Sequence, residues 1–223
     1  MLVIAQSLTK IYQRGAEKIH ALQGVNLQIA AGSFVFVTGP SGGGKSTLLH
    51  LIGGMDRPNS GTLSVGGFAI HQASEDQLTR FRREHIGFVF QFFNLLSSLD
   101  ALENVCLPHL ARGMRPKEAR RQALQMLEQV GLASRTRHKP AELSGGEQQR
   151  VAIARAVAGK PGLVLADEPT GDLDAANAQA VMALMRELNR SLGITFIVAT
   201  HNEGLTCPGE RVFELHAGKL RER

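Results

Sequence analysis

The chain has 223 residues, of which 43% are hydrophobic and 20% charged, with a formal net charge of +5. This length can hold one α/β domain with a subdomain, and it leaves no room for long coiled-coil insertions or tandem modules. No apolar run approaches the ~18 residues that span a bilayer, and residues 1–6 lack the pattern of a secretory signal. We therefore expect a reduced cytosolic protein in which Cys106 and Cys207, far apart and outside any C-x-x-C motif, are small core residues.

Two strands are predicted at residues 2–11 and 19–29, and a turn at residues 30–32 then leads into the apolar run 34–37. Tyr12 follows the first strand, where an aromatic ring can stack on a purine base. A half-exposed strand tyrosine fits the same position, so the pattern leaves both interpretations open.

A glycine-rich loop follows the strand at 34–37 and precedes a helix at 48–52, which is the context of a phosphate-binding P-loop. Its glycines let backbone N–H groups surround an anion, and the helix N-terminus adds a positive dipole. Lys45 brings a charge to the β and γ phosphates, and the Ser46 hydroxyl can ligate Mg²⁺. The nucleotide-binding residues predicted in this loop are Gly39, Pro40, Ser41, Gly42, Gly43, Gly44, Lys45, Ser46 and Thr47.

The next part of the chain predicts a turn at residues 53–61, a hairpin over 63–70 and a short charged helix over 75–83. Residues 86–90 predict a buried strand, and Gln91 stands directly after it. Because open α/β sheets bind ligands at the carboxyl ends of their strands, Gln91 is a candidate site residue.

Residues 92–160 predict a mostly helical insertion between two parallel strands, with helices near 100–110 and 116–130. Its first residues, 92–97, are too apolar for a plain surface loop. Residues 112–139 carry eight Lys or Arg residues against two acidic residues, which accounts for the whole positive excess of the chain. A solvated helix face, nucleic acid and an anionic membrane surface each explain this stretch, although a chain without Trp and with a single Tyr is unlike a single-strand binder.

Ser144 can cap a helix that begins with Gly145 and Gly146, and Glu147 completes a capping-box pattern. The glycines leave the first N–H groups of this helix open, which makes it a second potential phosphate site. A helix that is simply well capped has the same spacing, so the local pattern does not decide between the two interpretations.

A core strand is predicted at residues 163–166, and it ends at Asp167 and Glu168. In a chain with a P-loop, the first carboxylate can hold Mg²⁺, usually through water, and the second can polarise an attacking water. An amphipathic helix over 175–192, a buried strand over 194–199 and a hairpin over 211–221 follow. His201 comes at the end of that strand, as Gln91 does at its own, so it is a candidate site residue, although a lone His is more often structural.

Taken in order, these motifs resemble an ABC-type ATP-binding cassette over nearly the whole chain. They are the P-loop, Gln91, Leu143–Glu147, Asp167–Glu168, Asp172–Asp174 and His201. The P-loop alone is shared by many NTPases, whereas a P-loop with Leu-Ser-Gly-Gly-Glu is highly specific. Segments at 53–58, 87–96, 101–105 and 166–171 are similar to those of the lipoprotein-release and macrolide-efflux group, which includes the cell-division cassette that works with an FtsX-like membrane protein.

The resemblance implies an α/β fold, a P-loop NTPase (RecA-like) parallel core sheet with an antiparallel β subdomain and an inserted α-helical subdomain. The chain would be a single nucleotide-binding domain, 1–223, with the core and β subdomain in about 1–91 and 161–223 and the helical subdomain in about 92–160. The implied partners are a second copy, in a head-to-tail homodimer around two ATP molecules with Mg²⁺, and an integral membrane permease subunit. We expect no nucleic-acid partner and a peripheral position on the cytoplasmic face of the inner membrane.

The same resemblance implies a role for each site residue of an ATPase. Tyr12 stacks on adenine, Gln91 senses Mg²⁺ and the membrane partner, and Asp174 communicates across the dimer. The second phosphate site, which serves the ATP of the partner copy, consists of Ser144, Gly145, Gly146 and Glu147. The catalytic residues are Lys45, Glu168 as general base and His201 at the γ-phosphate. The metal-binding residues are Ser46, Gln91 and Asp167.

Some positions depart from the family pattern, namely Gly43 for the more usual Ser, Asp172 for Asn, and Asn202 for Asp. Two glycines and a proline in residues 203–209 also oppose the helix that the family places there. None of these changes removes a chemical group, so we still expect hydrolysis. Two rivals are a soluble ABC ATPase that acts on nucleic acid and an ATP-gated regulatory module of a cell-division or cell-wall hydrolase complex. The sequence does not separate the second rival from export, and it does not name a substrate.

Overall fold

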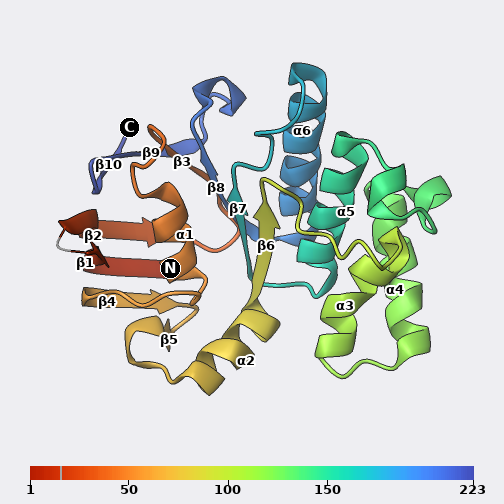
Figure 1. The fold of residues 1–223 in the computed structure, drawn as a ribbon, viewed down its shortest axis with the longest axis horizontal. Helices are drawn as coiled ribbons and strands as arrows, with labels where there is room; N and C mark the ends of the chain where they lie inside the picture. The colour runs from red at the N-terminus through yellow and green to blue at the C-terminus, as the bar shows by residue number, and fades with distance from the viewer. Residues whose placement is uncertain (16) are drawn as a thin grey trace.

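The computed structural model describes residues 1–15 and 17–223, and it contains two sheets flanked by helices (Figure 1). The strands are β1 (Val3–Arg14), β2 (Glu17–Ile29), β3 (Phe34–Thr38), β4 (Ser60–Val65), β5 (Phe68–Ala69), β6 (Ile86–Phe90), β7 (Leu163–Asp167), β8 (Thr195–Thr200), β9 (Arg211–His216) and β10 (Lys219–Glu222). The α-helices are α1 (Lys45–Ile52), α2 (Glu75–His85), α3 (Ala101–Ala111), α4 (Pro116–Gln129), α5 (Gly145–Ala158) and α6 (Ala175–Leu192).

The larger sheet has the strand order β10-β9-β3-β8-β7-β6, in which all neighbours are parallel except the hairpin β9–β10. The smaller sheet, β2-β1-β4-β5, is antiparallel. The ends of β3, β8 and β7 therefore lie side by side. The P-loop follows β3, His201 follows β8, and Asp167 ends β7 directly before Glu168. This is the strand edge at which open α/β sheets bind ligands.

Alternating side chains of the central strands divide between two hydrophobic cores. Phe36, Val164 and Val198 belong to a core with α3, α4, α5 and α6. Their neighbours on the same strands, such as Val37 and Leu165, belong to a second core with α1, α2 and the antiparallel sheet. Figure 1 shows this division, with α1 on one side of β6–β8 and α3–α6 on the other. The helices that begin at Lys45 and Gly145 are therefore on opposite sides of the sheet.

Most of the predicted elements are present, with small shifts of their ends. The first strand continues past Tyr12 to Arg14, and the P-loop helix begins at Lys45 rather than at 48. Ile70 was expected in the hairpin, but it lies in a 3₁₀ turn, Ile70–Gln72, where its buried side chain packs into the second core. The expected break in residues 203–209 is present, because only Glu203–Leu205 forms a 3₁₀ turn.

The prediction that both cysteines are core residues is wrong for one of them. Cys106 on α3 is buried, whereas Cys207 is exposed, and both are free thiols. Cys207 lies in the irregular segment before β9, where its backbone N–H donates to the carboxylate of Glu210 at 2.7 Å. Leu205 is the residue of this segment that enters the core, and Cys207, two residues later, lies on the surface.

The chain between Phe90 and Leu163 carries α3, α4 and α5, which pack on one another and on α6. Division of the chain into a core with a β subdomain and a helical subdomain stays a prediction. In the described part of the chain, none of the helices is both long and apolar enough to span a bilayer.

Candidate functional site

The P-loop has a backbone that only glycine adopts easily. Gly39 and Gly44 have φ angles of 143° and 102°, in the left-handed region. A Cβ at Gly39 would collide with the carbonyl oxygen of Leu215, and one at Gly44 would collide with that of Ala21. The loop is thus packed tightly between β9 and β2, so its N–H groups are held at the start of α1.

Lys45 is only 6% exposed, and its ammonium group stabilises the conformation of the loop. Its Nζ donates to the carbonyl oxygens of Gly39 at 2.8 Å and Pro40 at 3.1 Å. The same Nζ lies 3.6 Å from Oε1 of Glu168. The cation is therefore surrounded by loop carbonyls and one carboxylate, at the place where the sequence predicts phosphate.

Glu168 stands at the centre of the predicted catalytic residues. It follows β7 with a φ of 46°, a left-handed backbone that is uncommon for a residue other than glycine. Its N–H donates to the carbonyl oxygen of Ala199 on β8 at 2.9 Å. Its Oε2 accepts from the backbone N–H of His201 at 3.3 Å and lies 3.1 Å from His201 Nδ1. The structure thus brings Lys45, Glu168 and His201 together, and strained backbone at such a place is typical of functional sites.

The predicted metal-binding residues lie around this cluster. Ser46 is exposed in the first turn of α1. Oδ1 of Asp167 is buried, and among the described residues it has no hydrogen-bond partner. Gln91 donates from Nε2 to Oδ1 of Asp172 at 3.3 Å. An unpartnered buried carboxylate oxygen and an exposed hydroxyl both fit a hydrated Mg²⁺, which prefers oxygen ligands and keeps several waters.

Tyr12 lies beside the P-loop helix and is 37% exposed. Its hydroxyl donates to Oδ2 of Asp56 at 2.7 Å, and Nζ of Lys10 lies 4.9 Å from the centre of its ring. Burial, and then the hydrogen bond to Asp56, raise the pKa of the Tyr12 phenol, while the Thr47 hydroxyl of the P-loop acts in the opposite direction. Tyr12 is therefore a half-exposed strand tyrosine with fixed partners, and its free surface leaves room for a base.

The second predicted phosphate site is the N-terminus of α5, on the other side of the sheet. The capping box is present, since Glu147 N–H donates to Ser144 Oγ at 3.3 Å and Ser144 N–H donates to Glu147 Oε2 at 2.8 Å. Arg135 Nε lies 3.0 Å from Glu147 Oε1. The Ser144 backbone and Arg135 lower the pKa of Glu147. The helix is well capped and opens with two glycines, and phosphate binding at this end stays a prediction.

The start of α6 packs directly on this second site. Asp174 caps α6 by accepting from Asn177 N–H at 2.8 Å, and Asn177 Nδ2 donates to its other oxygen at 2.6 Å. These bonds lower the pKa of Asp174. A Cβ on Gly146 would lie 2.7 Å from Asn177 Oδ1, so only glycine fits there without a shift. Asp174 and Gly146 thus form a cluster separate from Lys45, Glu168 and His201.

Sequence reasoning missed several residues that support these clusters. Gln149 on α5 is buried and donates from Nε2 to the carbonyl oxygen of Pro169 at 2.5 Å, which ties α5 to the segment after Glu168. Arg155 on α5 donates to the carbonyl oxygens of Phe93 at 2.9 Å and Asn94 at 2.6 Å. Lys10 occupies an inward position, next to Leu8 along β1 and opposite Leu22 on β2, and the plain alternation of the strand gives no signal for it.

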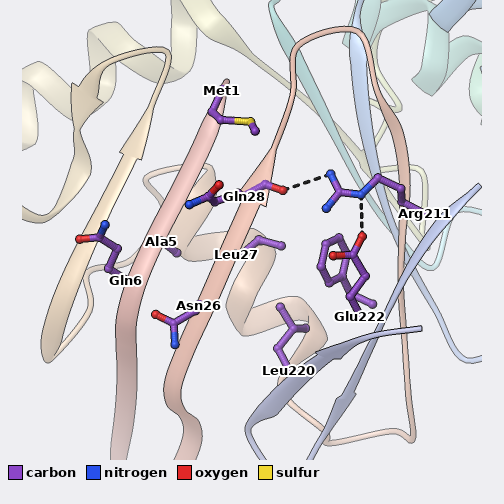
Figure 2. Close-up of a pocket in the computed structure, with 10 residues that line it drawn as sticks. Met1, Ala5, Gln6, Asn26, Leu27, Gln28, Arg211, Leu220 and Glu222 are labelled. Atoms are coloured by element: carbon purple, nitrogen blue, oxygen red, sulfur yellow. Dashed lines mark hydrogen bonds and ion pairs between the residues drawn. The ribbon is translucent and has the colours of Figure 1, made fainter.

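A separate hollow lies between the β1–β2 pair and the β9–β10 hairpin (Figure 2). Arg211 spans it, donating to the carbonyl oxygen of Gln28 at 3.1 Å and to Glu222 Oε1 at 2.7 Å. Its lining is Met1, Ala5, Gln6, Asn26, Leu27, Gln28, Arg211, Phe213, Leu220 and Glu222. This hollow is therefore distinct from the predicted nucleotide site.

Comparison with known proteins agrees with this geometry. The family model described as "ABC transporter" matches residues 22–171. The lipoprotein-releasing system ATP-binding protein LolD of Legionella pneumophila (strain Paris) is 47% identical over 223 residues, covering 100% of this chain and 98% of the relative. The protein of the same name from Xanthomonas axonopodis pv. citri (strain 306) is 48% identical over 221 residues, covering 99% of this chain and 91% of the relative.

A solved structure is similar over the same length. It is a dimeric post-hydrolysis state of the ATP-binding cassette MJ0796 bound to ADP and Pi, with a TM-score of 0.91 and 44% identity, covering 100% of this chain and 98% of that chain. The fold and the order of the motifs define an ATP-binding cassette, with the P-loop NTPase α/β fold that the sequence predicts. The chain belongs to the ABC transporter family, in the group of LolD-like ATP-binding subunits, and it is an ATPase.

Proposed function

We propose that this chain is the ATP-binding subunit of a lipoprotein-releasing system, peripheral on the cytoplasmic face of the inner membrane. The observation that supports this most strongly is the full-length similarity to two proteins named for that system, at 47% and 48% identity. In this proposal ATP hydrolysis by two copies drives an integral membrane subunit, which recognises the lipoprotein.

The two separated phosphate-binding ends support a head-to-tail dimer. Helix α1, which the P-loop opens, packs on one face of the sheet and α5 on the other, so the two predicted phosphate-binding ends belong to opposite faces. In the dimer, Ser144, Gly145 and Gly146 of one copy close over the ATP that the P-loop of the other copy holds. The similar cassette is itself described as dimeric, in a state bound to ADP and Pi.

The proposed mechanism uses the groups at the ends of β3, β7 and β8. Backbone N–H groups of the P-loop and the Lys45 ammonium bind the β and γ phosphates. Glu168, held by His201, accepts the proton of the attacking water, and His201 contacts the γ-phosphate. Ser46, Asp167 and Gln91 would hold Mg²⁺, which neutralises phosphate charge when it is bound. Tyr12 stacks on the adenine base.

The sequence favours residues 92–99, through Phe93 and Leu95, as the contact for the membrane subunit, and we keep the contact in this segment but assign it to other side chains. Phe92, which follows Gln91 directly, is 73% exposed, and Leu96 is 49% exposed. Phe93 and Leu95, in contrast, are partly buried, and Leu95 packs against the core of α3–α6. Phe92 and Leu96 are therefore the side chains that an apolar partner surface would cover.

Assembly and lipoprotein release test the proposal directly. The chain would be expressed with a candidate membrane subunit from the same organism, purified as a complex, and placed in proteoliposomes that carry a labelled lipoprotein. We expect ATP-dependent release of the label. We expect Phe92→Glu and Leu96→Glu to prevent assembly while the isolated chain keeps its ATPase activity. Leu124→Glu on α4, where Leu124 is 41% exposed, is the matched control and should assemble normally. ATP-driven assembly without any lipoprotein release would overturn the assignment of substrate class.

A further inference from the structure

Lys10 is a buried cation on a strand, far from the phosphate-binding loop in sequence. Lys10 is only 9% exposed. Its Nζ lies 2.5 Å from Asp56 Oδ1 and donates to the carbonyl oxygen of Arg57 at 2.7 Å. A buried charge is costly unless it is paired and hydrogen-bonded, and here it is both. Asp56 is therefore the residue that neutralises the buried Lys10 cation.

Asp56 uses its two oxygens for different partners. Oδ1 accepts from Lys10 and from the Arg57 backbone N–H at 2.7 Å, while Oδ2 accepts from the Tyr12 hydroxyl at 2.7 Å. Burial opposes the charged form of Asp56, but the hydrogen bonds from Lys10, Tyr12 and Arg57 outweigh it and lower its pKa. The carboxylate therefore stays ionised and bridges the lysine and the tyrosine.

The tyrosine ring is held from two directions by this network. Its hydroxyl is bound by Asp56, and the Lys10 ammonium lies 4.9 Å from the ring centre, within the range of a cation–π contact. A ring restrained at its edge and over a face loses little further freedom when a ligand stacks on its remaining surface. The network thus prepares Tyr12 to bind a flat aromatic group.

Asp56 also links this ring to the phosphate-binding loop. It lies in the turn that follows α1, where Met55 N–H donates to the carbonyl oxygen of His50. The P-loop opens α1 and Asp56 follows its end, so one helix carries the phosphate contacts and the support for Tyr12. The distance between the two binding surfaces is then set by a rigid element rather than by a loop.

We propose that Lys10 and Asp56 are positioning residues for ATP, because they fix the Tyr12 ring in the orientation in which it stacks on the base. This inference rests on the proposed adenine contact of Tyr12. It concerns only the base end of the nucleotide, so the triphosphate alone should bind without help from the network.

The test compares ATP with inorganic triphosphate, which lacks the base. We expect Asp56→Asn and Lys10→Met each to lower ATP affinity about tenfold, on the scale of a weakened base–aromatic stack. Triphosphate affinity should not change in either variant. Glu75→Gln is the matched control, because Glu75, at the start of α2, forms an exposed ion pair at 2.9 Å with Arg57, the residue after Asp56. That variant should bind ATP as the parent does.

A spectroscopic measurement makes the role of Tyr12 visible. The chain has one tyrosine and no tryptophan, so its tyrosine absorbance and emission come from Tyr12 alone. We expect the Tyr12 phenol to ionise at a lower pH in Asp56→Asn than in the parent, since the hydrogen bond to Asp56 helps raise its pKa. ATP should change the tyrosine emission of the parent protein more than that of the Asp56→Asn variant.

Each outcome has a definite meaning. Normal ATP affinity in both Asp56→Asn and Lys10→Met overturns the inference, and so does an equal loss of triphosphate affinity, which would show a general collapse of the loop. Tyr12→Ala separates the inference from the proposed function. If Tyr12→Ala binds ATP normally, the adenine contact itself is wrong. If Tyr12→Ala loses affinity and the two network variants do not, the contact stands and the positioning role is wrong.

Discussion

The N-termini of α1 and α5 are both predicted to bind phosphate, yet they are built differently. Helix α1 begins after Gly44, whose backbone is left-handed. Among the described residues no side chain caps this helix, and its first turn carries no acid. Helix α5 begins after Ser144 in a complete capping box with the carboxylate of Glu147 in its first turn. The first helix leaves its initial N–H groups open for an anion, whereas the second already satisfies part of its own.

The difference shows what each end can do alone. The α1 end combines open N–H groups, a helix dipole and the Lys45 ammonium, all of which favour an anion, so we expect it to bind phosphate without a second copy. The α5 end has the same dipole, but a carboxylate partly cancels it. An incoming phosphate must therefore be held mainly by another body, which is consistent with the proposal that α5 completes a site on a second copy.

Glu168→Gln gives the largest expected effect, because it leaves both helix ends intact and removes only the base. Loss of a general base typically lowers turnover by ~10²–10⁴-fold. If the two ends meet across a dimer, ATP will also double the mass of this variant in light scattering, and ADP will not. A variant that hydrolyses ATP at the parent rate would falsify the base assignment. A variant that stays monomeric with ATP would contradict the meeting of the two ends.

Gly146→Ala should have the second-largest effect on turnover, because it disturbs the α5 end alone. The new Cβ would lie 2.7 Å from Asn177 Oδ1, and displacement of a site by about 1 Å can cost up to ~10²-fold in rate. We expect turnover to fall while the isolated chain binds ATP with parent affinity, measured by titration calorimetry. Gly145→Ala is the milder control, since its Cβ would lie 3.4 Å from a Leu173 methyl carbon. Equal losses in both variants would show that packing against α6 is not the cause.

Ser144→Ala should have a smaller effect on stability. Removing an N-cap typically costs ~1 kcal/mol, so the free energy of unfolding in urea should fall by about that amount. Turnover should fall as well, because the Ser144 hydroxyl is part of the proposed second site. Ser74→Ala removes the equivalent cap of α2, where Ser74 Oγ accepts from Gln77 N–H at 3.3 Å. It should lose similar stability and keep its turnover.

The smallest expected effect is a change in the pH dependence of stability when Glu147 is replaced by Gln. The Ser144 backbone and Arg135 lower the pKa of Glu147, so its contribution is present above its unfolded pKa of about 4.3. That contribution is lost as the pH falls through the lowered folded value. Glu147→Gln should therefore show a slightly shallower loss of stability in acid, measured by thermal unfolding below about pH 5. An acid limb identical to that of the parent would mean that the contacts of Glu147 with the Ser144 backbone and Arg135 add no pH-dependent stability.

The order of motifs made the family and the parallel sheet predictable, because a P-loop, a strand-end acid pair and a Ser-Gly-Gly-Glu helix each leave a local pattern. The left-handed backbone of Glu168 was not predictable, since it depends on a hydrogen bond to Ala199 on a neighbouring strand. The contact of Gly146 with Asn177 likewise joins two helices far apart in sequence. Long-range contacts of this kind leave little trace in the local pattern.

Lys10 was missed for a more specific reason. A bulge shifts the register of β1 between Ala5 and Leu8, with Ser7 at a φ of 49°, so the inward positions change from odd to even numbers. Val3 and Ala5 face inward before the bulge, and Leu8 and Lys10 face inward after it. An even alternation along the strand would have placed Lys10 and Tyr12 on the outer face.

The two hydrophobic cores share the same strands, and this sharing affects the cooperativity of unfolding. Strands β3, β7 and β8 each send alternate side chains into both hydrophobic clusters, so neither cluster can come apart while the other keeps its sheet. Heat or denaturant should consequently unfold the chain in one cooperative transition, and the helices between β6 and β7 should lose their structure at the same midpoint as the P-loop region.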